Sequence, residues 1–236
     1  MSDDEKAVVC PADSRVIIGS LRTNSNLFLK GKFFDYEELL GSNKNEWLQA
    51  FHNGDFVVCR LTPEKYHYNH TPVAGVVRGY YEYDGHYHSC NPGPVLTLAT
   101  PYSKNKRVVT VIDTDVDGGT GIGLIAMVEV VALMIGEIVQ RYCEAEYHDP
   151  KPIKRGMFLR CGCPKSPFRP GSSTTVLLFQ EQRVDFCQDL LTNLHRGDIP
   201  SRYSQCLGKP LVETDVKVRA TIGRRKGKNE EVSNGL

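Results

Sequence analysis

The sequence lacks an excess of charge of either sign. Its 29 lysines and arginines are nearly balanced by 28 aspartates and glutamates, which gives a formal net charge of +1. Such a chain has no global electrostatic attraction to a nucleic acid or to a strongly anionic membrane. The composition therefore argues against a nucleic-acid partner.

The sequence also lacks a recognisable targeting or transmembrane segment. Its start, MSDDEKAVVCPADS, has no basic region followed by an apolar run, unlike a secretory signal or a transit peptide. Residues 121–138 form the only long apolar stretch, but Glu129 lies in its middle and glycines interrupt it. We interpret this stretch as two buried strands, or as one strand joined to a short helix. These features predict a cytoplasmic protein.

A dense cysteine framework is absent as well. The eight cysteines are spread over 236 residues, which is unlike a small disulfide-rich secreted domain, so we expect reduced thiols. Cys161 and Cys163 form a C-x-C pair, a weak metal signal that we interpret as part of a loop. We expect no metal.

The sequence is rich in short β-branched runs that lie between turn signals. Helical patterns are few, and the clearest lie at 35–51 and 185–197. We expect a β-dominated single domain over residues 1–222, with helices at its margins. The charged residues 223–236 contain almost no large apolar side chain and predict a disordered tail.

Three polar segments could carry chemistry. The first, GSST at 171–174, precedes the β-prone run TTVLLF, and the second, CPADSRV at 10–16, places Asp13 in a turn before a strand. Taken alone, the first is an ordinary loop entering a strand, and the aspartate of the second caps its own backbone.

The third segment, EKYHYNHTPVAG at 64–75, contains His67 and His70. Two histidines three residues apart can bind a metal on a helix, but Pro63 and Pro72 bracket the pair and disfavour a helix. A histidine carried by a loop is better suited to act as a general base.

In this order the three segments resemble the signature of the phosphatidylserine decarboxylase family. That signature is a turn similar to S-P-A-D-G-R-V, a central L-x-P-x-x-Y-H-R-x-H-x-P-V-x-G motif, and G-S-T followed by a hydrophobic strand. The sequence has CPADSRV, LTPEKYHYNHTPVAG and GSSTTVLLF, and the resemblance extends over roughly residues 8–200. It implies an α+β fold, predominantly antiparallel β-sheet with a few peripheral helices.

The resemblance also implies a self-processing, pyruvoyl-dependent carboxy-lyase. In this family a serine hydroxyl attacks the preceding peptide carbonyl, and an acyl shift followed by β-elimination splits the chain and leaves a pyruvoyl group. Asp13, His70 and the serine match the family's Asp-His-Ser set, which follows the logic of an activated nucleophile. The pyruvoyl cofactor then forms a Schiff base with the substrate amine and accepts electrons as carbon dioxide leaves.

Two serines are candidates for the cofactor precursor. An ungapped alignment with the following strand places Ser173 on the cleaved serine and Ser172 where glycine is usual, whereas one inserted residue would make Gly171-Ser172 the scissile bond. We favour Ser173. Cleavage there gives a larger β chain of about residues 1–172 and a smaller α chain of about 173–222, both within one folded unit.

Several departures from the family concern the substrate. Val131 and Leu133 replace a usual glycine and threonine, Tyr68 replaces an arginine, and His88 lies where an aromatic or aliphatic residue is common. Together with His67, which we expect to position substrate or to pack structurally, these residues predict an apolar, weakly cationic pocket. The resemblance implies that the substrate is phosphatidylserine, with peripheral membrane contact, or a free L-amino acid.

Other functions remain open at this point. The fold could serve a non-catalytic scaffold or binding protein, although retention of Asp13, His70 and two serines argues against it. A zinc protein that uses the histidines and cysteines is a weaker alternative. Because homodimers are common among such enzymes, a homodimer is a further expectation.

Overall fold

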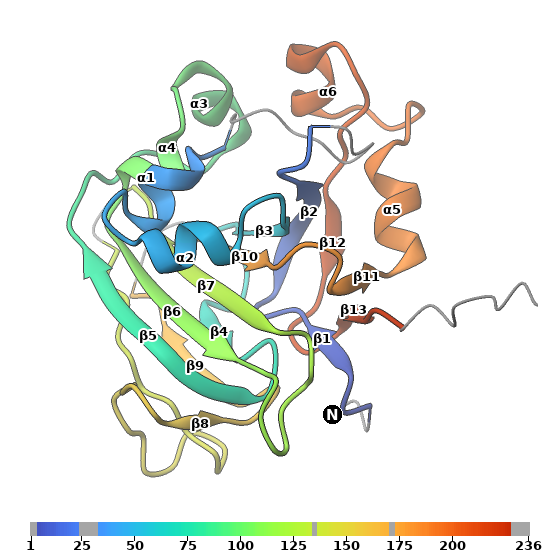
Figure 1. The fold of residues 1–236 in the computed structure, drawn as a ribbon. Helices are drawn as coiled ribbons and strands as arrows, with labels where there is room; N and C mark the ends of the chain where they lie inside the picture. The colour runs from blue at the N-terminus through green and yellow to red at the C-terminus, as the bar shows by residue number, and fades with distance from the viewer. Residues whose placement is uncertain (1–3, 24–32, 134–135, 170–172, 228–236) are drawn as a thin grey trace, which may run out of the picture.

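The computed structural model describes residues 4–23, 33–133, 136–169 and 173–227 (Figure 1). Its main feature is an eight-stranded sheet in the order β12, β2, β3, β10, β7, β6, β5, β8. All neighbouring strands in it are antiparallel, which confirms the predicted fold class. The strands are β2 (Ser14–Ser20), β3 (Asp55–Leu61), β5 (Gly75–Tyr83), β6 (Arg107–Asp113), β7 (Leu124–Val131), β8 (Phe158–Leu159), β10 (Ser173–Phe179) and β12 (Thr214–Val216).

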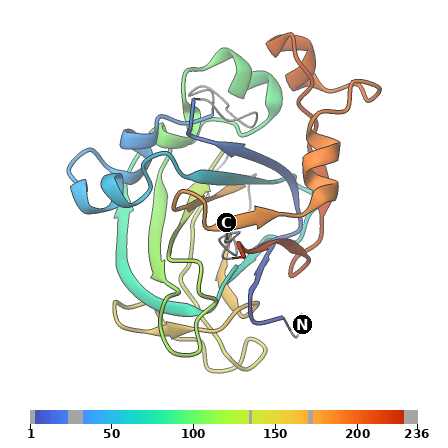
Figure 2. The same ribbon diagram turned by 45° about the vertical axis from the view of Figure 1, so that its right-hand side comes forward.

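Two smaller sheets pack beside the central one. One has the order β1, β13, β11, and the other pairs β4 with β9, both with antiparallel neighbours. Their strands are β1 (Ala7–Val9), β4 (Tyr68–His70), β9 (Pro164–Pro167), β11 (Val184–Phe186) and β13 (Thr221–Arg225). The first small sheet brings the beginning and the end of the described chain together (Figure 2).

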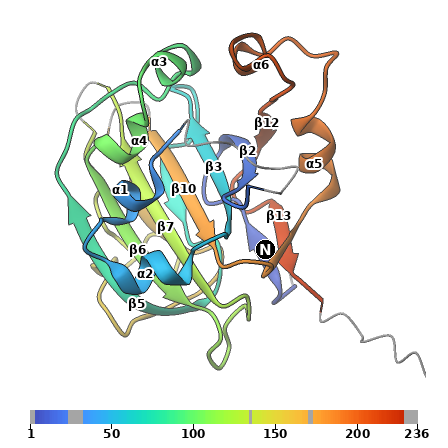
Figure 3. The same cartoon turned by 45° about the horizontal axis from the view of Figure 1, so that its top comes forward.

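Short helices lie at the margins of the sheet. They are α1 (Tyr36–Leu40), α2 (Asn45–Ala50), α3 (Pro92–Thr97), α4 (Pro101–Lys104), α5 (Gln188–Leu194) and α6 (Arg202–Leu207). The Asp35 side chain caps α1 by accepting a hydrogen bond from Glu38 N at 2.8 Å. Figure 3 shows α1 and α2 in front of the sheet, where Arg107 of β6 donates to Leu39 O at 2.9 Å.

Strand β10 lies at the centre of the core because β3 and β7 flank it on both sides. All seven of its residues are buried. Alternation along the strand directs Val176 and Leu178 to the face covered by α1 and α2, and Ser173 and Thr175 to the opposite face. The β4–β9 pair covers this second face, because Thr175 Oγ1 donates to Asn69 Oδ1 of β4 at 2.9 Å.

Two predictions about the chain's organisation were wrong in detail. The tail does not begin at 223, because residues 223–225 belong to β13 and form backbone hydrogen bonds with β1 and β11. Charged side chains point outward there while the backbone completes a sheet. Residues 228–236 lie outside the described part of the chain. Among the described residues of the apolar stretch 121–138, one strand is formed, β7, and Ile138 makes an isolated bridge to Phe168.

Across the described ranges, no helix combines the length and apolar character needed to cross a membrane.

Candidate functional site

Ser173 begins β10 at one end of the central sheet. It is paired with Leu61 of β3 on one side and with Val131 of β7 on the other. Asp13 immediately precedes β2, the next strand beyond β3, so it lies at the same end of the sheet. With strands about 4.8 Å apart, two strand spacings place Asp13 roughly 10 Å from the strand of Ser173. The described residues show no contact between the two.

The Ser173 hydroxyl is buried without a hydrogen-bond partner. The residue is 2% exposed, and its Oγ has no partner among the described residues. Buried polar groups are nearly always paired, so an unpaired hydroxyl at this position requires an explanation. Gly171 and Ser172, the other residues of the predicted cleavage site, lie outside the described residues.

The segment around β4 presents different side chains on its two faces. The rings of Tyr66, Tyr68 and His70 contact one another at centroid distances of 5.8–6.1 Å, so these alternate residues share one face. Asn69 points the other way, toward the central sheet, where it contacts Thr175. By the same alternation His67 belongs to the face that points to the sheet.

His67 lies at the Ser173 end of the sheet. Its carbonyl accepts a hydrogen bond from Phe168 N at 3.0 Å, and Phe168 packs with Leu61, the strand partner of Ser173. Its Nδ1 lies 2.6 Å from the carbonyl oxygen of Lys65, which can only accept a hydrogen bond. Nδ1 therefore carries the hydrogen in neutral His67, and Nε2 keeps its lone pair. That Nε2 is buried and has no partner among the described residues.

His70 is buried in a different environment, on strand β4 and not on the loop that the sequence predicted. Its Nδ1 lies 2.9 Å from Gly162 O and 3.3 Å from Arg219 Nε, and its Nε2 lies 3.2 Å from the Tyr66 hydroxyl. Burial lowers the pKa of His70, the hydrogen bond with Gly162 opposes this shift, and the Arg219 charge adds to it. No side-chain contact joins His70 to Asp13 or Ser173 among the described residues.

Asp13 is held by the C-terminal segment. Its carboxylate accepts hydrogen bonds from Val218 N at 2.8 Å and from Lys217 Nζ at 3.2 Å. Partial burial opposes ionisation, but these two contacts lower the pKa of the Asp13 carboxyl below its usual value. The expected orientation of His70 by Asp13 is thus absent here, and the carbonyl of Gly162 contacts the imidazole in its place.

Only some of the predicted substrate-binding residues lie near Ser173. Val131 is fully buried opposite Ser173, and its carbonyl accepts from Asn105 Nδ2 at 2.8 Å. Asn105 Nδ2 also donates to the carbonyl of His88, which brings His88 to the same end of the sheet. Leu133 is 45% exposed two residues beyond β7. Tyr68 lies with His70 on the face away from Ser173.

Sequence reasoning missed a buried polar network beneath this site. Glu129 of β7 and Lys165 of β9 form an ion pair of 2.6 Å, with both side chains 0% exposed. Asn69 Nδ2 donates to Glu129 Oε1 at 2.8 Å, and Ser166 Oγ donates to the same oxygen. Gln140 bridges the pair, accepting from Lys165 Nζ at 2.7 Å and donating to Glu129 Oε2 at 2.9 Å. A charge within the apolar stretch was the available signal, but its partner is 36 residues away.

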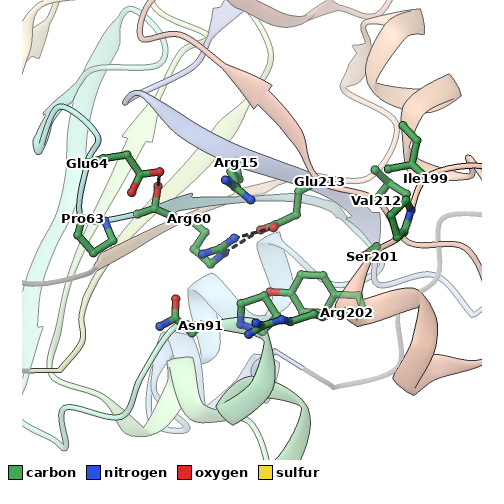
Figure 4. A pocket seen from close by; sticks show the side chains of 14 residues that line it. Arg15, Arg60, Pro63, Glu64, Asn91, Ile199, Ser201, Arg202, Val212 and Glu213 are labelled. Atoms are coloured by element: carbon green, nitrogen blue, oxygen red, sulfur yellow. Dashed lines mark hydrogen bonds and ion pairs between the residues drawn. The ribbon is translucent and has the colours of Figure 1, made fainter.

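A cavity of about 530 Å³ opens on the helical face at the same end of the sheet (Figure 4). Its lining includes Arg15, Arg60, Arg202 and Thr62, and Thr62 follows Leu61, the partner of Ser173. Arg60 makes a bidentate contact with Glu213 at 2.6 and 2.8 Å, whereas Arg15 and Arg202 are exposed. The cavity thus contains two arginines for which the described residues provide no ion pair.

The cysteines and histidines form no metal centre in the described ranges. No group of three histidine, cysteine or acidic side chains there is arranged to hold an ion. All eight cysteines are free thiols, and burial raises the pKa of Cys90 to about 12, far from a reactive thiolate.

Comparisons with known proteins identify similar chains. A family model described as phosphatidylserine decarboxylase matches residues 1–202. The chain is 31% identical over 197 residues to phosphatidylserine decarboxylase proenzyme 2 of Oryza sativa subsp. japonica, covering 83% of this chain and 29% of the relative. It is 31% identical over 207 residues to a phosphatidylserine decarboxylase proenzyme of Chlamydia trachomatis serovar L2, covering 87% and 63%. The chain therefore spans less than two thirds of the length of either relative.

Proposed function

Because the chain belongs to the phosphatidylserine decarboxylase family, whose members are pyruvoyl-dependent carboxy-lyases, we propose that it cleaves itself before Ser173 and then decarboxylates an amino-acid group. The observation that carries this proposal is the buried, unpartnered hydroxyl of Ser173 at the end of the sheet where His67 presents a free Nε2. A nucleophile needs an adjacent base, and these two unpaired atoms supply one donor and one acceptor. The described residues show no hydrogen bond between the two atoms, so the proposal requires His67 Nε2 and Ser173 Oγ to approach each other for cleavage.

In the proposed cleavage, His67 Nε2 takes the proton of Ser173 Oγ as the oxygen attacks the carbonyl carbon of residue 172. The proton is then delivered to the amide nitrogen as the peptide C–N bond breaks, and residue 173 is joined through an ester. Loss of the Cα proton of residue 173 then breaks the ester Cβ–O bond, which releases the new carboxylate of residue 172 and leaves a dehydroalanine. Water adds to the imine form of this residue and displaces ammonia to leave the pyruvoyl group. His67 carries out both proton transfers without reorienting, because the Lys65 carbonyl fixes its tautomer.

After cleavage, the pyruvoyl group supplies an electron-withdrawing carbonyl that accepts the electron pair released as carbon dioxide leaves. The chain's own residues exclude water and deliver the proton. Val131 closes the site from the neighbouring strand, and His67 protonates the carbon that has lost its carboxylate. Asp13 holds the segment at Lys217 and Val218 against this end of the sheet.

The two histidine variants are expected to differ. His67→Ala removes the proposed base and should slow cleavage about 10²- to 10⁴-fold, the usual contribution of general acid–base catalysis. His70→Ala removes a ring that lies among tyrosines and should slow cleavage less than about tenfold. Cell-free synthesis with a labelled amino acid, followed by denaturing gels over time, measures both rates. A larger loss of cleavage rate in His70→Ala than in His67→Ala would mean that His70, the residue that the family motif predicts, is the base.

For the substrate, we propose phosphatidylserine. The cavity beside Thr62 lies at the Ser173 end of the sheet but on the face opposite to the Ser173 side chain, so a bound substrate would have to extend around this end of the sheet. Its Arg15 and Arg202 suit the phosphodiester of a lipid headgroup, which can extend away from the reacting amino-acid group, better than a free amino acid. The free L-amino acid predicted from the apolar substitutions is the alternative outcome of the assay.

Arg202→Ala should raise the KM for phosphatidylserine up to about fivefold, since Arg202 is exposed and an exposed pair of opposite charges contributes about 0.2–1 kcal/mol. The matched control is Arg196→Ala, because Arg196 pairs with Asp198 outside the cavity. The assay measures phosphatidylethanolamine from phosphatidylserine in detergent micelles, in parallel with amine from free amino acids. Turnover of a free amino acid alone, with no effect of Arg202→Ala, would reject the lipid proposal.

A further inference from the structure

The buried network beneath Ser173 joins every segment that the proposed reaction requires. Asn69 is two residues from His67 on the face of the β4 segment that points to the sheet. Thr175 is two residues from Ser173 on the matching face of β10. The two are joined by a hydrogen bond of 2.9 Å from Thr175 Oγ1 to Asn69 Oδ1. The network therefore includes Asn69, the neighbour of His67 on the same face, and Thr175, the neighbour of Ser173 on the same face.

Glu129 orients the amide of Asn69. Since Thr175 donates to the amide oxygen and Glu129 Oε1 accepts from the amide nitrogen at 2.8 Å, both ends of the amide are fixed. Glu129 is itself opposite Thr175 on the neighbouring strand. The Asn69 amide thus ties β4 to β7 through Glu129 and to β10 through Thr175.

Lys165 pairs with that carboxylate inside the protein. Its Nζ lies 2.6 Å from Glu129 Oε2, and Gln140 donates to the same oxygen at 2.9 Å. Both charges are fully buried, an arrangement that often contributes no net stability compared with an apolar pair of the same size. Its presence next to the cleavage segment therefore points to a role other than stability.

We propose that Glu129 is a positioning residue, which through Asn69 holds the β4 segment against β10 so that His67 faces Ser173. This inference rests on the proposed function. Lys165 lies before the cleavage site and Thr175 after it, so the same network also holds the two fragments in register once the chain is cut.

The test compares cleavage rates of variants that keep the fold. In Glu129→Leu/Lys165→Met, both charges are removed together, so we expect a folded chain with a melting temperature above that of Lys165→Met, although Asn69, Ser166 and Gln140 lose a partner, and we expect cleavage slowed at least about tenfold. Thr175→Val should slow cleavage as well, because it removes the hydrogen bond to Asn69 alone. Lys151→Met, whose side chain is 65% exposed and lies outside the network, is the control and should cleave within about twofold of the wild-type rate.

A double-mutant cycle separates positioning from a general structural effect. If the network acts through His67, adding His67→Ala to Glu129→Leu/Lys165→Met should cost less than His67→Ala costs alone, because residues of one unit are not additive. Fully additive losses, or cleavage of Glu129→Leu/Lys165→Met at the wild-type rate, would overturn the inference. A wild-type chain that never cleaves would instead reject the proposed function, so the two failures are distinguishable.

Discussion

Ser173→Ala should abolish self-cleavage and leave a single chain of 26.4 kDa. Alanine has no hydroxyl, so neither the attack on the preceding carbonyl nor the formation of a pyruvoyl group can occur. The expected effect is complete loss, since cleavage of the bond between residues 172 and 173 requires a hydroxyl on residue 173 itself. Denaturing gels and intact mass after overnight incubation at 25 °C provide the measurement.

Ser172→Ala is the matched control for the choice of serine. The ungapped alignment predicts that this variant still cleaves, because residue 172 supplies only the carbonyl that is attacked. If cleavage persists in Ser173→Ala and stops in Ser172→Ala, Ser172 is the precursor of the pyruvoyl group. The alignment with one inserted residue would then be correct.

Lys165→Met should cause the largest loss of stability of any single substitution described here. It leaves the Glu129 carboxylate fully buried without its cation, and breaking one side of a buried ion pair costs about 3–5 kcal/mol. Urea unfolding of each variant in the Ser173→Ala background, where the chain stays intact, measures the difference.

Two further variants show whether the loss arises from the unpaired charge. Glu129→Leu/Lys165→Met should recover most of the stability because no buried charge remains. Lys151→Met is the matched surface control, since the Lys151 side chain is 65% exposed and its contact with Asp149 spans 4.0 Å, so its effect should stay within about 0.5 kcal/mol. A Lys165→Met chain as stable as wild type would mean that the ion pair is not formed in solution.

The fold class was predictable because the signals for it are local. β-Branched runs such as those of β6 and β10 lie between turns, and Asp35 is an N-cap residue that marks the start of α1. The strand at 221–225 was not predictable from its composition, because it is formed by backbone pairing with residues 7–9 at the other end of the chain. Cytoplasmic location and a homodimer stay predictions of the sequence.

The candidate site was only partly predictable for a similar reason. The motif identified both histidines, but which of them faces Ser173 depends on the pleat of β4 and on its packing against the sheet. The single contact that fixes the tautomer of His67 is a local one, with Lys65 O. Glu129 is visible in the sequence as a charge within an apolar stretch, but it meets Lys165 only in the folded chain, so the sequence does not reveal the pair.

The most direct test of the central claim is the intact mass of the purified wild-type protein under denaturing conditions. We expect two fragments, residues 1–172 and a smaller one that begins at residue 173 and resists Edman sequencing because a pyruvoyl group blocks its amino terminus. A folded wild-type protein that shows only the uncut mass of 26.4 kDa would contradict self-processing and leave a non-catalytic member of the family.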